Sequence, residues 1–240
     1  MSFLSWGPPA VRPLAAPAAG GPGNPWFSWQ YVHDNTDLLR TALLYHAGLT
    51  ARAVLVALVV ALPLAVVAYW IKPLTGPILA LSGLLYTIPS LALLALIAPV
   101  VGTTSDTTIL IALVLYALLV LVRNALAGLT AVPAEVKEAA SGMGYGRFGR
   151  LWRVELPLAL PGIITGLRLA TVSTVALVTV GALIGKGGLG GLILGGFRNN
   201  FYKAEILTGT VLCVALALVL DVLLAALGRL LTPWTARRTA

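Results

Sequence analysis

Five long apolar blocks dominate the pattern of this chain, at residues 49–71, 74–101, 107–122, 157–183 and 206–231. A helix that crosses a bilayer needs about 20 mostly apolar residues, so the pattern predicts about five transmembrane helices. The third block reaches that length only if its helix continues through residues 123–129. No polar stretch long enough for a soluble domain is left over. The chain is therefore predicted to be an all-α, polytopic membrane protein.

The first 36 residues differ from the rest of the chain. Gly, Pro and Ala dominate the stretch WGPPAVRPLAAPAAGGPGNP, which is typical of a flexible tail and lacks the pattern of a secretory signal. Four aromatic side chains then suit a belt at the level of the lipid headgroups: Trp26, Phe27, Trp29 and Tyr31. From Asp37 the apolar positions suit an amphipathic interfacial helix. We therefore expect a tail and interfacial segment at residues 1–36 and a transmembrane domain at residues 37–240.

Composition narrows the possible functions. Hydrophobic residues make up 59% of the chain and charged residues 10%, and the net charge is +8. The basic residues lie mainly at the ends of the apolar blocks, as in membrane proteins, so lipid and not nucleic acid is the expected partner. Cys213 lies in an apolar run and suits packing, while His33 and His46 lack further ligands at metal-binding spacing. No metal site and no catalytic residues are predicted, so we do not expect an enzyme.

Lys and Arg are distributed unevenly between the ends of the blocks. If the long loop at residues 123–155 is cytoplasmic, ten of the sixteen basic residues lie on the cytoplasmic side and six on the other. The short GTTSD loop on the outer side contains neither Lys nor Arg. Because cytoplasmic loops carry an excess of these residues, we predict an external N-terminus and a cytoplasmic C-terminus in the plasma or inner membrane.

Several prolines interrupt the apolar blocks: Pro63, Pro77, Pro89, Pro99 and Pro161. Each removes a backbone donor and favours a kink, which a bilayer tolerates where other protein or a water-filled cavity satisfies the freed carbonyl group. The second block is thus predicted to lie inside the protein and to line a translocation pathway, with candidate residues Tyr86, Thr87, Pro89 and Ser90. A kinked helix that only packs against its neighbours is an equally good interpretation.

The loop between the third and fourth blocks contains two predicted short helices. It reads VPAEVKEAASGMGYGRFGRLWRVELP from residue 132 to residue 157. Pro133 suits the first position of a helix, residues 134–141 favour helix, and the glycines that follow permit a sharp turn. The second helix is expected to place Phe148, Leu151, Trp152 and Glu155 along one face.

This loop resembles the cytoplasmic signature of permeases of binding-protein-dependent ABC importers. The signature is Glu-Ala-Ala, three residues, Gly, nine residues and Ile-x-Leu-Pro. The matching residues here are Glu138, Ala139, Ala140, Gly144, Val154, Leu156 and Pro157, with Val in place of Ile. The resemblance implies that residues 130–156, which we term the coupling loop, dock on a separate ATPase, with Glu138 making polar contact and Gly144 forming the turn. An ordinary amphipathic interfacial loop is the alternative.

The same resemblance implies several partners. These are an ABC ATPase subunit dimer, a second permease subunit (a second copy or a similar paralogue) and an extracellular solute-binding protein. ATP and Mg²⁺ would be bound by the ATPase, and this chain would hold no cofactor. Cation–π cages of several aromatic rings suit quaternary ammonium groups, but Tyr69, Trp70, Tyr86 and Tyr116 are scattered along the spans. Selection of the solute is therefore expected mainly in the external binding protein.

Three further stretches resemble permeases for glycine betaine, choline, carnitine and related osmoprotectants. They are YTIPSLALLALI from residue 86, VPAEVKEAASGMGY from residue 132 and VGALIGKGGLGGLI from residue 180. Methionine-type amino-acid permeases share the loop and a related five-span layout, and therefore remain an alternative. A self-sufficient secondary carrier is a second alternative, but such carriers commonly show internal repeats and mid-membrane ion-coupling groups.

A glycine-rich segment follows the fourth block. Gly185, Gly187 and Gly190 satisfy G-x-G-x-x-G, but no strand precedes them as a dinucleotide site requires. Lys186 is followed by Gly and so does not complete a phosphate-binding loop. The segment instead suits a hairpin of close backbone approach on the outer side. In the resembling family it lies near the external mouth, which makes Gly185, Gly187, Gly188 and Gly190 candidate residues facing the binding protein. A plain packing turn is the alternative.

Two charges fall within the predicted spans. Arg168 lies eleven residues beyond Pro157, and Asp221 lies eight residues before Arg229. Both are thus expected in the inner half of the membrane, where charges are costly and usually paired. We predict a structural pair between Arg168 and Asp221, with Arg123 as a competing partner for the carboxylate.

Overall fold

The computed structural model describes residues 23–103 and 105–234, and in this part of the chain it contains helices and no strand. In chain order the elements are α1 (Trp29–Asp34), α2 (Thr36–Trp70), α3 (Lys72–Thr87), α4 (Ser90–Val101), α5 (Asp106–Thr130), α6 (Ala134–Gly142), α7 (Arg147–Arg150), the π-helical turn η1 (Leu151–Glu155), α8 (Leu156–Val180), the 3₁₀ turn η2 (Gly181–Ile184), α9 (Leu189–Arg198) and α10 (Lys203–Leu231). The predicted all-α class is confirmed.

Four stretches are long and apolar enough to cross a membrane: Thr36–Trp70, Asp106–Thr130, Arg147–Ile184 and Lys203–Leu231. The pair formed by α3 and α4 passes the same test together and is bent by 95° at its break, so the described chain has four spans, or five if the bent pair counts as one. The expected number of about five is confirmed. The third block does continue, because its helix runs without a break to Thr130.

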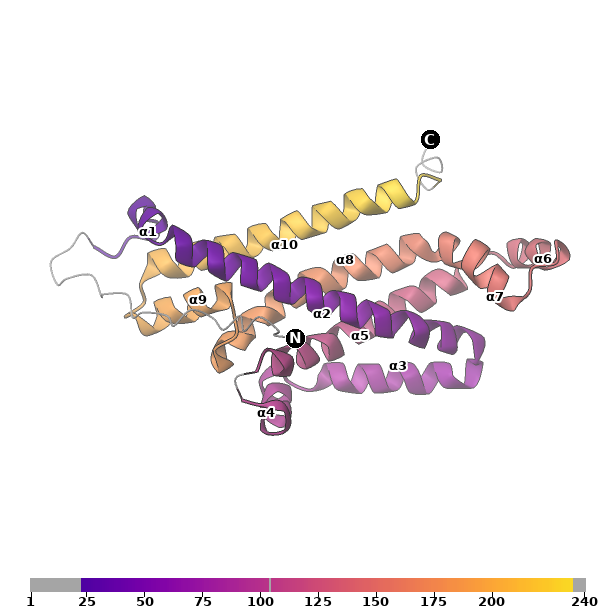
Figure 1. Cartoon of the computed structure of the whole chain (residues 1–240), viewed down its shortest axis with the longest axis horizontal. Helices are drawn as coiled ribbons and strands as arrows, with labels where there is room; N and C mark the ends of the chain where they lie inside the picture. The colour runs from indigo at the N-terminus through magenta and orange to yellow at the C-terminus, as the bar shows by residue number, and fades with distance from the viewer. Residues whose placement is uncertain (1–22, 104, 235–240) are drawn as a thin grey trace, which may run out of the picture.

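Helix α2 differs from the expected arrangement. The interfacial helix from Asp37 and the first span were expected as separate elements, but α2 is continuous over 35 residues, or about 52 Å. Pro63 lies inside this helix without ending it, and one face carries fully buried alanines at Ala53, Ala57, Ala61, Ala65 and Ala68. Small side chains let helices approach closely. This face packs on α5 and α8, which run beside α2 through the centre of the bundle (Figure 1).

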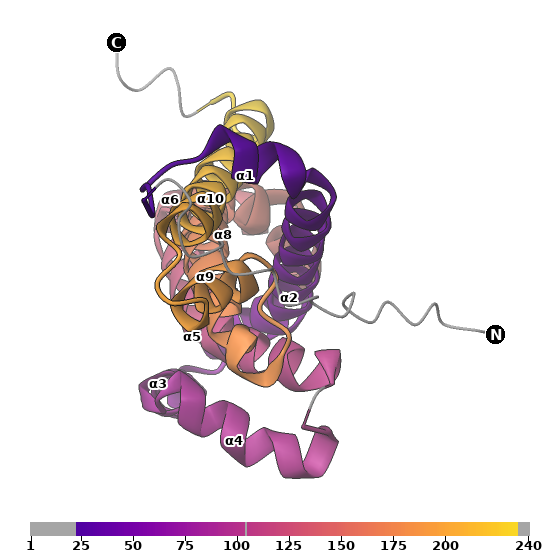
Figure 2. The same cartoon turned by 90° about the vertical axis from the view of Figure 1, so that its left-hand side faces the viewer.

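The second block is broken more sharply than a kinked helix would be. Pro89 has no backbone N–H, and the residue before a proline avoids the helical region. Ile88 is accordingly extended, with φ −65° and ψ 126°. Helix α4 therefore leaves the direction of α3 and lies across it at one side of the bundle (Figure 2).

The two ends of the bundle carry different elements (Figure 1). At one end, which we term the coupling end, α6 and α7 lie beside the end of α2 and the start of α3. At the other end lie α1, α9 and the start of α10. The spans differ strongly in burial. In the most apolar 18-residue stretch of each helix, half of the residues of α5 are buried inside the protein, but only 6% of those of α10. Most of α10 is thus left for lipid or another chain to cover.

Candidate functional site

The coupling loop forms a compact corner of two helical segments. Helix α6 ends at Gly142, and Gly144 turns the chain with a φ of +85°, a conformation that glycine adopts without steric cost. Helix α7 then passes through η1 into α8 without an intervening loop. The second segment is therefore the base of a membrane-spanning helix, so a displacement of this segment is also a displacement of α8.

The four side chains that were predicted to lie along one face of the second segment do not share a face. Leu151 and Glu155 are buried, whereas Phe148 and Trp152 are 67% and 69% exposed. The π-helical turn explains the difference, because its wider spacing changes the direction in which successive side chains point. The exposed rings of Phe148 and Trp152 lie on the same loop as exposed Met143, and together they give the coupling loop an apolar outer surface.

The seven residues of the signature differ in burial and fall into three groups. Glu138, Ala139 and Gly144 are exposed, so these positions are free to contact another protein. Ala140 is buried. Three residues lie half-buried at the base of α8: Val154, Leu156 and Pro157. The first part of the signature is thus an accessible surface, and the last part is the attachment of that surface to a span.

Cationic side chains hold the loop against the end of α2. The ammonium group of Lys137 lies 5.3 Å from the ring centroid of Tyr69, and the guanidinium carbon of Arg147 lies 4.4 Å from that of Trp70. Arg147 also donates to the Trp70 carbonyl oxygen at 3.2 Å. Phe148 packs edge-on against Trp70 with centroids 5.0 Å apart. The coupling loop is therefore attached to α2 as well as to α8.

The predicted pathway residues gather at the break between α3 and α4. Tyr86 is 45% exposed, and its ring packs edge-on against Tyr116 of α5 with centroids 5.8 Å apart. The Tyr116 hydroxyl donates to the Ile88 carbonyl oxygen, beside the break. Four aromatic residues were expected to be scattered. Two of them instead form this pair, while Tyr69 and Trp70 lie at the coupling end.

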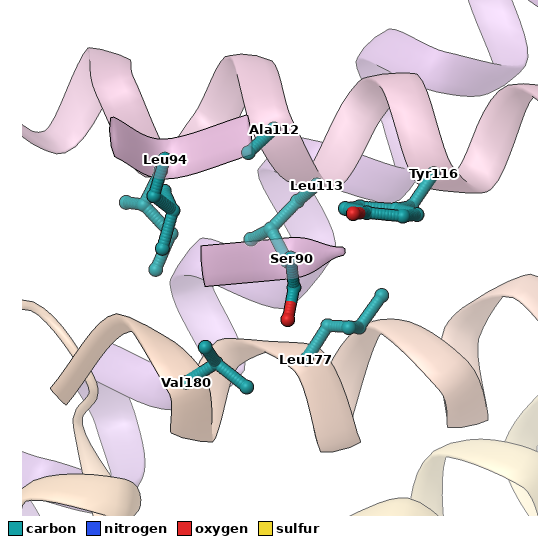
Figure 3. Close-up of a pocket in the computed structure, with 8 residues that line it drawn as sticks. Ser90, Leu94, Ala112, Leu113, Tyr116, Leu177 and Val180 are labelled. Carbon is teal, nitrogen blue, oxygen red and sulfur yellow. The ribbon is translucent and has the colours of Figure 1, made fainter. Parts of the chain in front are cut away.

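A small cavity lies beneath the same break (Figure 3). Its volume is about 10 Å³, enough for roughly one water molecule. Eight residues line it: Ser90, Leu94, Ile109, Ala112, Leu113, Tyr116, Leu177 and Val180. Of the four candidate pathway residues, Ser90 points into this cavity (Figure 3), while Tyr86, Thr87 and Pro89 are exposed and do not line it. The cavity is too small for an organic solute in this conformation.

The glycine-rich segment at residues 185–191, which we term the glycine loop, makes two different uses of glycine. Gly185 and Gly188 have φ values of +76° and +51°, which favour glycine. Gly187 and Gly190 are close to other backbone: an added Cβ would lie 2.3 Å from the Ala182 nitrogen and 2.5 Å from the Thr179 Cα atom, respectively. The expected close approach is thus present at this loop.

Polar side chains around the glycine loop were not anticipated as a group. The Lys186 ammonium group lies 2.9 Å from a carboxylate oxygen of Asp106, which also accepts a hydrogen bond from the Tyr45 hydroxyl at 3.0 Å. In the sequence, His46 stood out only for its lack of further metal ligands at binding spacing. It is fully buried, with Nε2 3.0 Å from the Val175 carbonyl oxygen. Val175 lies 129 residues further along the chain, so no local pattern indicates this contact.

The structure brings Arg168 and Asp221 together. The guanidinium group donates from Nε and from a terminal nitrogen to the two carboxylate oxygens, each at 2.8 Å. This bidentate geometry joins α8 to α10 and makes Arg168, not Arg123, the partner of Asp221. Within the described residues no three His, Cys, Asp or Glu side chains are grouped as a metal site would require.

Known proteins resemble this chain over most of its length. The family model for binding-protein-dependent transport system inner membrane components matches residues 53–237. The osmoprotectant import permease protein OsmW of Salmonella typhimurium is 38% identical, with 85% of this chain and 96% of the relative covered. The choline transport system permease protein OpuBD of Bacillus subtilis is 36% identical, with 81% and 85% covered. The resemblance inferred from the coupling loop is confirmed.

Solved structures show the same fold. The inward-facing MetNI methionine ABC transporter matches with a TM-score of 0.76 at 22% identity, over 83% of this chain and 98% of the matched chain. An amino acid ABC transporter with histidines matches with a TM-score of 0.71 at 20% identity, over 84% and 98%. At these identities the likeness concerns the fold and not the solute.

Proposed function

The chain belongs to the binding-protein-dependent transport system inner membrane components, and from this membership we propose that it forms half of the membrane channel of an ATP-driven importer for osmoprotectants such as glycine betaine, choline or carnitine. The observation that carries the proposal is the coupling loop, whose exposed signature face is continuous with the span α8. A force applied to this face has a direct route into the membrane.

Energy comes from outside this chain in the proposed mechanism. Two ATPase subunits, which bind ATP and Mg²⁺, close on nucleotide and displace the coupling loops of two permease chains. Glu138 and Ala139 contact the ATPase, with the apolar side chains of Met143, Phe148 and Trp152 beside them. The second permease covers part of the exposed surface of the bundle, and an external binding protein delivers the solute at the opposite end.

This mechanism sets the orientation in the membrane. If the coupling end is cytoplasmic, the segment around α1 and the glycine loop are external, because α2 runs from the α1 end to the coupling end (Figure 1). Helix α10 runs back towards the coupling end, so under the same condition the C-terminal end of the described chain is cytoplasmic. The glycine loop then lies on the side of the binding protein, where Gly185 is exposed, while Gly187 and Gly190 are buried and serve close packing.

The solute passes the break between α3 and α4 in this proposal. Tyr116, which contacts Tyr86, lies ten residues from the start of α5 and fourteen from its end, or about 15 Å and 21 Å. Irregular backbone at such depth must be buried in protein or line a water-filled cavity. The exposed ring of Tyr86 offers a cation–π surface to a quaternary ammonium group, while selection among solutes remains mainly with the binding protein.

Two observations favour osmoprotectants over amino acids as the solute. Two relatives that share more than a third of their residues with this chain over most of its length are named for osmoprotectants and for choline. The methionine transporter shares only 22%. A quaternary ammonium group also matches the exposed tyrosine at the break, because its charge is attracted to an aromatic face.

The experiment is reconstitution of the permease with its ATPase and binding protein in liposomes. We expect ATP-dependent uptake of labelled choline, glycine betaine or carnitine, and little uptake of methionine. Glu138→Lys should abolish co-purification of the ATPase. Glu135→Lys, a charge reversal on the same exposed helix but outside the signature, should retain the ATPase and serves as the matched control. Uptake by the permease alone, driven by an ion gradient, would contradict the proposal in favour of a secondary carrier.

A further inference from the structure

One arginine joins the two helical segments of the coupling loop. Arg150 donates from Nε to a carboxylate oxygen of Glu155 at 2.6 Å and from a terminal nitrogen to the Ser141 hydroxyl oxygen at 2.8 Å. The Ser141 hydroxyl in turn donates to the Lys137 carbonyl oxygen of α6 at 2.8 Å. A continuous series of polar contacts thus runs from the backbone of α6 to Glu155, the residue that precedes α8.

The position of these contacts matters because a glycine turn separates the same two segments. Gly142 ends α6, Gly144 and Gly146 follow it before α7, and an added Cβ at any of the three would meet nothing within 4 Å. Such a turn has little packing of its own to resist bending, and glycine gives its backbone wide freedom. The Arg150 contacts span this turn. Backbone hydrogen bonds from Gly144 to Ser141 and from Tyr145 to Ala140 close the turn itself, and the Arg150 contacts add a side-chain connection from α6 to the base of α8.

The burial of Glu155 supports a purpose other than stability. Its side chain is 1% exposed, and one of its carboxylate oxygens has no hydrogen-bond partner among the described residues. A buried ion pair of this kind generally contributes little more to stability than apolar side chains of similar size would. The rigid, planar fork of arginine does, however, fix the geometry of what it joins. The pair also closes over the π-helical turn, a feature common at functional sites.

We propose that Arg150 is a positioning residue for energy coupling. Through Ser141 and Glu155 it locks α6 to α8, so that a displacement of α6 by the ATPase is delivered to α8 as a rigid movement and is not absorbed by bending at Gly144. The proposal rests on the proposed function, since it requires an ATPase that acts on this loop.

The sharpest test removes only the contact with α6. Ser141→Ala deletes the hydroxyl group and leaves the ion pair between Arg150 and Glu155 intact, while Ser141→Thr retains a hydroxyl and is the matched control. In reconstituted complexes we measure the amount of solute imported per ATP hydrolysed. This ratio does not depend on how much protein is folded, so a merely structural defect leaves it unchanged. We expect Ser141→Ala to lower it about threefold to tenfold, the net effect of one partly exposed hydrogen bond, and Ser141→Thr to restore it.

A second set of variants tests the ion pair itself. Arg150→Gln leaves the buried carboxylate of Glu155 without its charged partner, so less folded protein is expected. Replacing both residues with Met removes the buried charge and should recover folded protein while the ratio of uptake to hydrolysis stays low. A wild-type ratio in Ser141→Ala, or in the double Met variant, would overturn the role of Arg150. Absence of ATP-dependent uptake in the wild-type complex would instead overturn the proposed function.

Discussion

The coupling loop and the glycine loop are both rich in glycine, but they use it for opposite purposes. At Gly142, Gly144 and Gly146 of the coupling loop the surroundings are open, and the loop is held by charged and aromatic side chains. At Gly187 and Gly190 of the glycine loop there is no room for a Cβ atom, because other backbone lies against them. One loop can therefore turn when its side-chain contacts change, whereas the other is fixed by close packing.

The largest expected effect concerns the glycine loop. Gly190→Ala would place a methyl group 2.5 Å from the backbone of Thr179, and because backbone cannot move aside as a flexible side chain can, we expect a loss of about 2–3 kcal/mol. Gly191→Ala is the matched control, since an added Cβ at Gly191 would meet nothing within 4 Å. Alanine also has a higher helix propensity than glycine. Thermal unfolding of the purified variants measures both. Equal stability of the two variants would contradict the distinction between the loops.

The ion pair between Arg168 and Asp221 tests whether a side-chain contact in the membrane resembles those of the coupling loop. Arg168→Gln and Asp221→Asn each leave one charge without its bidentate partner, and unpaired charges within a membrane are costly. Each single variant should therefore give several-fold less folded protein in a fluorescence size-exclusion assay. The double variant that exchanges the two residues should recover part of this loss. If the exchange recovers nothing, the pair does more than join α8 to α10.

A smaller effect is expected in the turn of the coupling loop. Gly144 has a φ of +85°, so Gly144→Ala should cost about 1 kcal/mol from backbone strain alone. Gly142→Ala, at the end of α6 where φ is ordinary and space is open, should cost nothing or stabilise slightly. The difference in melting temperature between the two variants is the measurement. A larger loss for Gly142→Ala would mean that the turn is more tightly packed than its open surroundings indicate.

The sequence predicted the helical fold and the coupling loop because both depend on local patterns. Apolar blocks of spanning length indicate transmembrane helices wherever they occur, and the spacing from Glu138 to Pro157 is local as well. The break at Pro89 was anticipated as a kink, but its 95° angle was not, because the direction after a break depends on what the second helix packs against. The continuity of α2 was missed because a change in composition was mistaken for a change in structure.

Contacts between distant segments were the hardest to predict. His46 and Val175 are 129 residues apart, and nothing near either residue indicates the other. Tyr86 and Tyr116 form a pair only because α3 folds back along α5. Arg168 and Asp221 could be paired in advance, since charges within spans are few and seek partners. Arg150 and Glu155 are close in sequence, but their contact depends on the π-helical turn, which the sequence pattern does not reveal.

The smallest effect is expected for the ion pair of Lys186, and it gives the sharpest comparison between the glycine loop and the coupling loop. Lys186 is the charged residue of the glycine loop, and its ion pair with Asp106 resembles the side-chain contacts of the coupling loop. If the glycine loop is held by its backbone, Lys186→Gln should cost at most about 1 kcal/mol, because the Asp106 carboxylate is 31% exposed and keeps its hydrogen bond from Tyr45 when the ammonium group is lost. That loss is well below the loss expected for Gly190→Ala, and thermal unfolding of the two variants compares them directly. A loss from Lys186→Gln as large as that from Gly190→Ala would mean that a side-chain contact holds this loop too. The two ends of the molecule would then be able to release their loops in the same way.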